Sequence, residues 1–216
     1  MTLRYDLYWS FRSPYSYLVT PRLLELEAEY DVACNVRPVF PLAVRTPEFF
    51  DRADPLYRSH LVADVTREAA FLGMPFRIPP RPDPVQQEKG NYRVAQPYIH
   101  RLTYLGVAAA ELGRGLQFLR EVSHIVWSGE VDNWHEDDHL ARAAERAGLD
   151  LSDMDAAVAA DNARFEKIVN ENQVAHRAAG HWGVPAMAFN GEIFFGQDRF
   201  NQLKWRMEAK GLARRR

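Results

Sequence analysis

The sequence lacks the features of a disulfide-bonded or membrane-spanning protein. It has one cysteine, Cys34, in 216 residues, so no disulfide can form within the chain and no C-x-x-C pair is present. Nowhere do about 18 apolar residues occur together, and the N-terminal segment has no apolar run suited to a signal peptide. We therefore expect a cytoplasmic protein without a membrane partner.

An excess of positive charge is also missing. Lysine and arginine number 27 against 29 aspartates and glutamates, which gives a net charge of −2. A nucleic-acid partner is not expected, because binding to phosphates requires a basic face. The remaining composition is ordinary for a folded protein, with 47% hydrophobic and 26% charged residues. The chain is long enough for one domain or for a domain with an insertion.

The beginning of the chain reads as strand, helix and strand, over residues 4–9, 15–29 and 34–40. A helical crossover between two strands predicts that the strands are parallel. After residue 41 the strand signal stops, and Ser152 and Asp155 have the spacing of a helix-capping pair. The middle of the chain is predicted to be helical over residues 55–73, 94–113, 116–128, 137–147 and 152–179, with a proline-rich loop over 76–90.

Strand patterns return at the end of the chain. Residues 186–189 and 192–195 flank Asn190-Gly191, which is a strong hairpin signal. A last helix is predicted from Asp198 onward. Because only the two ends carry strands, the order predicts an α/β sheet domain interrupted by an all-helical insertion. The expected boundaries are 1–44 with 181–216 for the sheet domain and 45–180 for the insertion.

Ser13-Pro14 follows the first predicted strand and marks the start of a helix. Serine is a preferred N-cap residue, and proline is favoured in the first helical turn. The hydroxyl of Ser13 is therefore expected at a helix N-terminus, where unpaired N–H groups and the helix macrodipole favour negative charge. A hydroxyl in that place can hold an anion such as a thiolate, or it can serve only as the helix cap.

Three short motifs, taken in order, carry a resemblance to a known family. They are Ser13-Pro14-Tyr15-Ser16-Tyr17, Gly183-Val184-Pro185 and Phe195-Gly196-Gln197-Asp198-Arg199. With the order of strands and helices, they span nearly the whole chain. The sequence resembles the DsbA superfamily of thioredoxin-like proteins, and within it the branch of 2-hydroxychromene-2-carboxylate isomerases and kappa-class glutathione transferases. The resemblance implies a thioredoxin-like fold with a large helical insertion.

The resemblance also implies a catalytic role for Ser13, which matches the first thiol position of redox members. Their C-x-x-C is replaced here by Ser13-Pro14-Tyr15-Ser16, so dithiol chemistry at this place is excluded. The thiol would come from glutathione as a cofactor, with Ser13 hydrogen-bonding the sulfur. Pro185 matches a cis-proline, and the backbone of Val184 would then pair with the cysteinyl part of glutathione.

Gln197 and Asp198 match positions that bind the γ-glutamyl end of glutathione. Asp198 would pair with the ammonium, while amides at the helix start would receive the carboxylate. Two simpler interpretations remain open. The Val184-Pro185 bond can be an ordinary trans bond ahead of a strand, and Asp198 can be only an N-cap.

The function that this resemblance implies is a glutathione-dependent cis–trans isomerase acting on a conjugated aromatic carboxylate. The alternatives are a kappa-like transferase that stops at the glutathione adduct, and a binding or chaperone-like module without redox chemistry. The resemblance also implies a homodimer. The roles of Arg12, Arg81 and His181 stay open: Arg12 could meet a substrate carboxylate, and His181 could act as a general acid or base.

One metal-site pattern is better interpreted as a surface helix. His135-Glu136-Asp137-Asp138-His139 reads as H-E-x-x-H, the zinc-protease motif. That motif normally lies on a buried helix with uncharged middle residues, whereas both middle residues here are aspartates. The segment lies at a predicted helix start, where acidic residues are favoured, and no third ligand follows at a recognised spacing. We therefore expect a solvated acidic first turn and no metal.

Overall fold

A mixed four-stranded sheet forms the centre of the fold. The computed structural model describes residues 2–79, 83–86, 88, 91 and 93–215. In this part of the chain the sheet has the order β2-β1-β3-β4, with β1 parallel to β2 and β3 antiparallel to both β1 and β4. The two ends of the chain therefore share one sheet, which confirms the predicted fold class. The strands are β1 (Leu3–Trp9), β2 (Val32–Pro38), β3 (Ala186–Phe189) and β4 (Glu192–Phe195).

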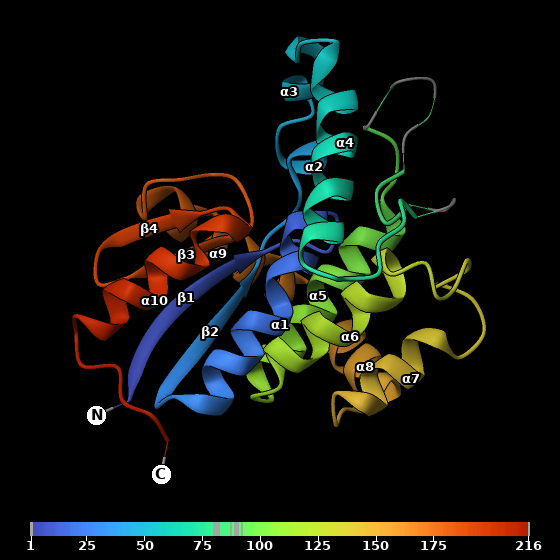
Figure 1. The fold of residues 1–216 in the computed structure, drawn as a ribbon. Helices are drawn as coiled ribbons and strands as arrows, with labels where there is room; N and C mark the ends of the chain where they lie inside the picture. The colour runs from blue at the N-terminus through green and yellow to red at the C-terminus, as the bar shows by residue number, and fades with distance from the viewer. Residues whose placement is uncertain (1, 80–82, 87, 89–90, 92, 216) are drawn as a thin grey trace.

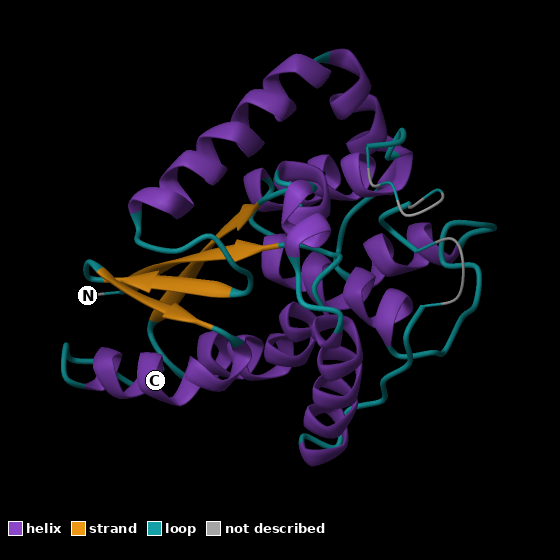
Figure 2. Cartoon of the chain, turned by 90° about the horizontal axis from the view of Figure 1, so that it is seen from above, coloured by secondary structure: helices purple, strands orange, loops and turns teal. Residues whose placement is uncertain are grey.

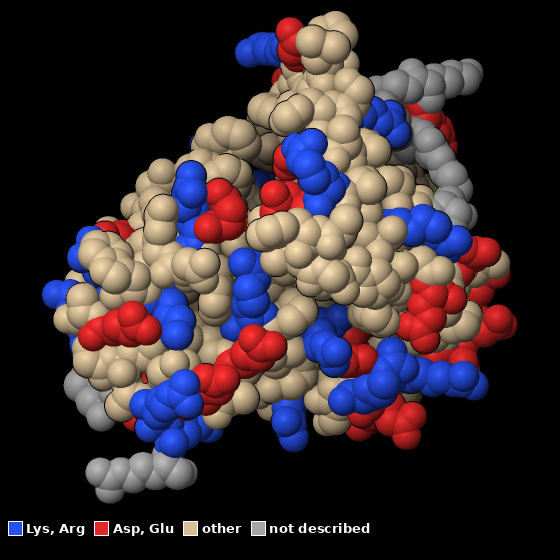
Figure 3. All heavy atoms as spheres, viewed as in Figure 1, with Lys and Arg blue, Asp and Glu red and all other residues tan. Residues whose placement is uncertain are grey.

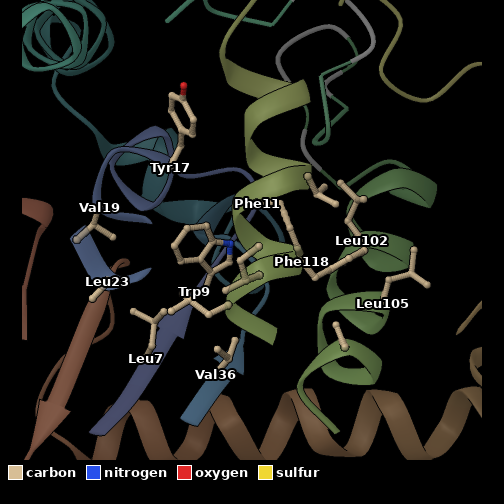
Figure 4. Packing of buried hydrophobic residues seen from close by; sticks show 14 of the residues in the cluster. Leu7, Trp9, Phe11, Tyr17, Val19, Leu23, Val36, Leu102, Leu105 and Phe118 are labelled. Atoms are coloured by element: carbon tan, nitrogen blue, oxygen red, sulfur yellow. The ribbon is translucent and has the colours of Figure 1, made fainter. Parts of the chain in front are cut away.

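Helices cover both faces of this sheet. In Figure 1, α1 (Pro14–Glu29) and α10 (Phe200–Glu208) lie in front of the strands, and α9 (Asn162–Ala178) lies behind them. The alternation along β1 explains both layers: Leu7 and Trp9 point toward α1 (Figure 4), whereas the ring of Tyr8 stacks on His176 of α9.

The segment between β2 and α9 is helical and packs against the sheet through α5 and α6. Its core is continuous with that of the sheet, because Phe11 and Phe118 meet edge to face at 6.1 Å (Figure 4). In Figure 1, helix α4 rises beyond the other helices, and it buries only Val65 and Ala69. Figure 2 shows the strands of the sheet with helices on both sides. The helices of this segment are α2 (Leu42–Arg45), α3 (Glu48–Arg52), α4 (Leu56–Phe71), α5 (Pro97–Glu111), α6 (Gly115–Trp127), α7 (His139–Arg146) and α8 (Leu151–Ala160).

The structure corrects the prediction of one long helix over 152–179. The chain breaks at Asp161, whose carboxylate accepts a hydrogen bond from the Arg164 N–H at 3.1 Å and so begins α9. The predicted capping pair of Ser152 and Asp155 is also wrong, because Asp150 caps α8. Aspartate side chains compete with the helix for backbone N–H groups, so they can stop and restart a helix that apolar spacing alone would continue.

Two further differences concern short elements. The helices α2 and α3 were not predicted, because four or five residues are too few to establish a helical period. The last helix begins with a 3₁₀ turn, η1 (Gln197–Arg199), and α10 follows from Phe200. None of the helices described here is both long and apolar enough to cross a membrane.

Candidate active site

Ser13 occupies the N-cap of α1. Its backbone is extended (φ −95°, ψ 114°), and its hydroxyl oxygen accepts a hydrogen bond from the Ser16 N–H at 3.2 Å. Pro14 takes the first helical position, where the N–H that it lacks would have no helical partner. The predicted N-cap role of Ser13 is confirmed, and its hydroxyl lies at the positive end of a 16-residue helix.

The same hydroxyl connects α1 to the loop before β3. The Ser13 O–H donates to the Val184 carbonyl oxygen at 3.1 Å, although the two residues are 171 positions apart. The Val184–Pro185 peptide bond is cis. The loop before Ser13 is anchored from the other side, because Trp127 Nε1–H donates to the Phe11 carbonyl oxygen at 2.9 Å. Ser13 and the Val184-Pro185 pair, which the sequence singled out, thus meet at one point.

A cavity of about 410 Å³ opens beside this contact, between α4 and the turn that follows β4. Val184, Gln197 and Asp198 line it, whereas Ser13 and Pro185 lie outside its lining. Figure 3 shows acidic and basic side chains on both sides of the hollowed region between α4 and the β3–β4 hairpin. The other lining residues are Tyr15, Asp64, Glu68, Phe195, Gly196 and Arg199.

Asp64 and Glu68 are acidic residues of the cavity that sequence reasoning missed. They are four residues apart on α4 and therefore share one face of the helix. The Tyr15 O–H donates to Asp64 Oδ2 at 2.6 Å, and this hydrogen bond holds the pKa of Asp64 below its usual value. Asp64 is therefore an anion at neutral pH. The spacing of the two acids was visible in the sequence, but no local pattern placed α4 against this site.

The side chain of Gln197 is buried, and both ends of its amide are engaged. Arg22 of α1 donates to Gln197 Oε1, and Gln197 Nε2 donates to Glu68 Oε2 at 2.7 Å. These contacts join α1, α4 and η1. The amide predicted to bind a cofactor therefore fixes the wall of the cavity and holds the turn that carries Asp198.

Asp198 is exposed and pairs with its neighbour Arg199, with 3.0 Å between Oδ2 and Nη1. The turn before it requires glycine, because Gly196 has a φ of 103° and a Cβ there would lie 2.5 Å from Asp198 Oδ1. The N-cap positions of η1 and α10 are Gly196 and Arg199. The interpretation of Asp198 as only an N-cap is therefore wrong. Its carboxylate lines the cavity next to a guanidinium.

The residues whose roles were left open lie in different surroundings. Arg12 Nε pairs with Asp83 Oδ1 at 2.6 Å, so its charge is engaged in the neighbouring loop. Arg81 lies outside the described residues. His181 Nδ1 accepts a hydrogen bond from the Gly183 N–H at 2.8 Å, and burial lowers the pKa of His181. At neutral pH this imidazole is uncharged and holds the loop that carries Val184.

Two further candidates do not line the cavity. Cys34 lies on β2 beside Tyr5, and burial raises the pKa of its thiol, so it stays protonated. His135 precedes α7, and His139 is the first residue of that helix, so the two imidazoles do not share a helical face. Within the described ranges, no three potential ligands among His, Cys, Asp and Glu are grouped to hold a metal ion.

Comparisons with known proteins agree with this fold. The sequence matches the family described as DSBA-like thioredoxin domain over residues 5–208. No match was found among curated protein sequences. Similar solved structures include a 2-hydroxychromene-2-carboxylate isomerase, with 21% identity, a TM-score of 0.70, and coverage of 96% of this chain and 95% of that chain.

Two other similar structures are described as redox proteins. A probable DsbA oxidoreductase from Streptomyces coelicolor has 19% identity and a TM-score of 0.66, with 96% of this chain and 90% of that chain covered. The cytosolic disulfide reductase DsbM from Pseudomonas aeruginosa, solved with GSH, has 16% identity and a TM-score of 0.63, with 95% and 100% covered. At these identities the likeness shows a shared fold, and the chemistry has to be argued from the site.

Proposed function

Since this chain belongs to the family of DSBA-like thioredoxin domains, we propose that it is a glutathione-dependent cis–trans isomerase. Its substrate would be a conjugated aromatic carboxylate of the 2-hydroxychromene-2-carboxylate type. The observation that carries the proposal is the Ser13 hydroxyl, which caps α1 and contacts the Val184 carbonyl beside the cavity. Disulfide exchange requires a thiolate, and neither Ser13 nor Ser16 has one. A hydroxyl at a helix start suits a thiolate supplied by another molecule.

The groups around the cavity fit glutathione. Asp198 suits an ammonium and Arg199 suits a carboxylate, so this pair complements the two charges of a γ-glutamyl end. The backbone of Val184 can pair with a peptide as an added strand would. When bound, glutathione would supply a nucleophilic thiol that adds reversibly to a conjugated double bond, which can then rotate as a single bond.

Ser13 and the N-terminus of α1 would control the charge of the bound sulfur. The Ser13 O–H now donates to the Val184 carbonyl, and an anion beside it would be a stronger acceptor. Moving this hydrogen bond would free the Val184 carbonyl to accept an N–H from the bound peptide. The Ser16 N–H keeps the Ser13 oxygen in place during the exchange. Both the hydroxyl and the helix end favour the ionised thiol and lower its pKa.

The test of the proposed reaction is to mix the purified protein with glutathione and 2-hydroxychromene-2-carboxylate. We expect the spectrum to shift to that of the trans isomer, at a rate that depends on glutathione, and no glutathione to be consumed. Intact-mass analysis of the small molecules would detect a stable adduct, which would point to a transferase. If neither an isomer nor an adduct forms, a binding module is the better description of the protein.

Asp198→Asn is expected to weaken glutathione binding while the fold is kept. Losing a charge-assisted hydrogen bond typically costs roughly 1.5–3 kcal/mol, and the exposure of Asp198 favours the lower end of that range. The measurement is titration calorimetry with glutathione. Asp138→Asn is the matched control, because Asp138 is similarly exposed and pairs with Arg142 at 2.8 Å, away from the cavity lining. Equal affinity in the two variants would remove Asp198 from the binding site.

A further inference from the structure

A continuous series of ring contacts runs from the cavity to the start of α4. Phe195 stacks on His181 with centroids 3.9 Å apart, and His181 stacks on Trp182 at 5.4 Å. Trp182 then meets Phe49 at 5.7 Å, and Phe49 meets Tyr57 at 5.6 Å. These five residues, which come from three separate parts of the chain, are called the aromatic arc below.

One end of the aromatic arc lines the cavity, and the other end lies on a helix that lines it. Phe195 is part of the cavity lining. At the other end, Tyr57 belongs to α4, the helix that supplies Asp64 and Glu68 to the cavity lining. Trp182, in the middle of the arc, belongs to the same loop as Val184. The middle of the arc therefore belongs to the loop that Ser13 contacts.

Trp182 in the middle of the arc and Phe195 at its cavity end are exposed to solvent. Trp182 is 41% exposed and Phe195 is 43% exposed. The Phe195 ring lies so close to the backbone of Gly183 that a Cβ there would be 2.4 Å from Phe195 Cε2. Exposed aromatic side chains that adjoin one another are typical of binding surfaces. Here the backbone of Gly183 restricts the position of the Phe195 ring.

The positive charge of Arg45 lies against the middle of the arc. Arg45 of α2 donates from Nη2 to the Trp182 carbonyl oxygen at 2.8 Å and from Nε to the Phe40 carbonyl oxygen. Burial lowers the pKa of Arg45 to about 10, so the guanidinium is still charged at neutral pH. In the part of the chain that the structure describes, its hydrogen bonds go to these carbonyl oxygens and no carboxylate pairs with it. A ligand carboxylate would supply the missing charge.

We propose that the aromatic arc and Arg45 form a binding site for a planar aromatic molecule that carries a carboxylate. Trp182 and Phe49 offer ring faces for stacking, and Arg45 pairs with the acid. This molecule would be the second substrate, so its role in turnover rests on the proposed function, but binding to the arc does not require glutathione. Phe195 at one end of the arc and Val184 both line the cavity, so the arc adjoins the segment that would bind glutathione.

The first experiment compares two ligands with the unmodified protein, which avoids any change to Arg45. Titration calorimetry is carried out with 2-naphthoate and with the neutral 2-naphthamide, each with and without saturating glutathione. We expect 2-naphthoate to bind about tenfold more tightly than the amide, because only the carboxylate forms a charge-assisted hydrogen bond. Equal binding of the two ligands, or no binding of either, would overturn the proposal.

The second experiment uses variants of the arc. Trp182→Ala and Phe49→Ala should each weaken 2-naphthoate binding about fivefold, because each removes a stacking surface. Trp205→Ala is the matched control, since Trp205 is 58% exposed on α10 and lies outside the arc. Circular dichroism checks the fold of each variant, and Phe49→Ala tests the arc independently of the loop that carries Val184. Equal losses in all three variants would contradict the proposal.

Glutathione titrations separate this proposal from the proposed function. Phe49→Ala should bind glutathione within about twofold of the unmodified protein, because Phe49 does not line the cavity and lies on α3, outside the loop that carries Val184. Carboxylate-selective binding that depends on Trp182, in a protein that fails to bind glutathione, would support the arc and refute the proposed function. Glutathione-dependent turnover without arc-dependent 2-naphthoate binding would refute the arc alone.

Discussion

Replacing Ser13 by alanine should raise the pKa of the bound glutathione thiol and lower turnover more than binding. The hydroxyl can hydrogen-bond the thiolate, and such a bond favours the charged form. A hydrogen bond to a charged group contributes roughly 1.5–3 kcal/mol, which corresponds to about one to two pKa units. The glutathione peptide would keep its contacts with Val184 and Asp198. The measurements are a pH titration of thiolate absorbance in the complex, the turnover rate and the dissociation constant.

Ser16→Ala is the matched control for this substitution. The Ser16 hydroxyl lies in the same helical turn, is buried, and has no hydrogen-bond partner in the described part of the chain. Its removal should leave thiol ionisation unchanged. Ser13→Ala also removes the cap of α1, which is expected to cost about 1 kcal/mol of stability, so thermal unfolding is measured for both variants. Normal ionisation and turnover in Ser13→Ala would leave Ser13 only its capping role.

Ser13→Cys tests from the opposite direction whether sulfur reaches this position. The introduced thiol would lie at the start of α1, where its pKa is lowered. Its thiolate should attack oxidised glutathione, forming a mixed disulfide and releasing one reduced glutathione. Intact-mass analysis should find one glutathionyl group in the variant and none in the unmodified protein, whose Cys34 stays protonated. The absence of an adduct would count against glutathione sulfur at Ser13.

Lowering the pH from 7 to 5 should destabilise the folded protein through His176. This residue of α9 is fully buried and stacks on Tyr8 at 4.3 Å. Burial, with the positive charge of Arg45 and the neighbouring His181 and Arg177, lowers the pKa of His176 to about 4. Against an unfolded value of about 6.5, this gives a loss of about 2 kcal/mol at pH 5.

Stability falls at low pH because the unfolded chain binds the proton at a higher pH than the folded chain does. As the pH falls below about 6.5, the unfolded chain protonates this histidine while the folded chain keeps it neutral. The contribution of His176 to stability is therefore complete above that pH and is lost progressively down to about pH 4.

Urea unfolding at a series of pH values measures this effect, and His176→Leu removes it. Burial also lowers the pKa of His100 and His181, so the slope of the unmodified protein includes their contributions. The difference between the unmodified protein and His176→Leu in how the free energy of unfolding depends on pH isolates the contribution of His176. Proton NMR of the unmodified protein gives a check that needs no variant, because the His176 ring should not titrate above pH 5. If the free energy of unfolding of the variant depends on pH as steeply as that of the unmodified protein, His176 is not the cause of the loss of stability.

The sequence by itself determined the elements whose signals are local. Alternation and helical spacing identified the strands at both ends, and the Ser13-Pro14 pair identified the start of α1. Asn190-Gly191 identified the hairpin, where both residues have positive φ. Missing thiols excluded dithiol chemistry without any structure. Each of these signals depends on interactions between residues that are a few positions apart, and the sequence shows such interactions directly.

Only the tertiary structure decided which distant groups meet. The contact between Ser13 and Val184, the placement of Asp64 and Glu68 on the cavity wall, and the engagement of Gln197 all join separate elements. Such contacts depend on how α4 packs against α1 and on where the loop before β3 lies, and no spacing along the chain encodes either. The aromatic arc has the same origin, because its rings come from segments that become neighbours only when the helical insertion folds back onto the sheet.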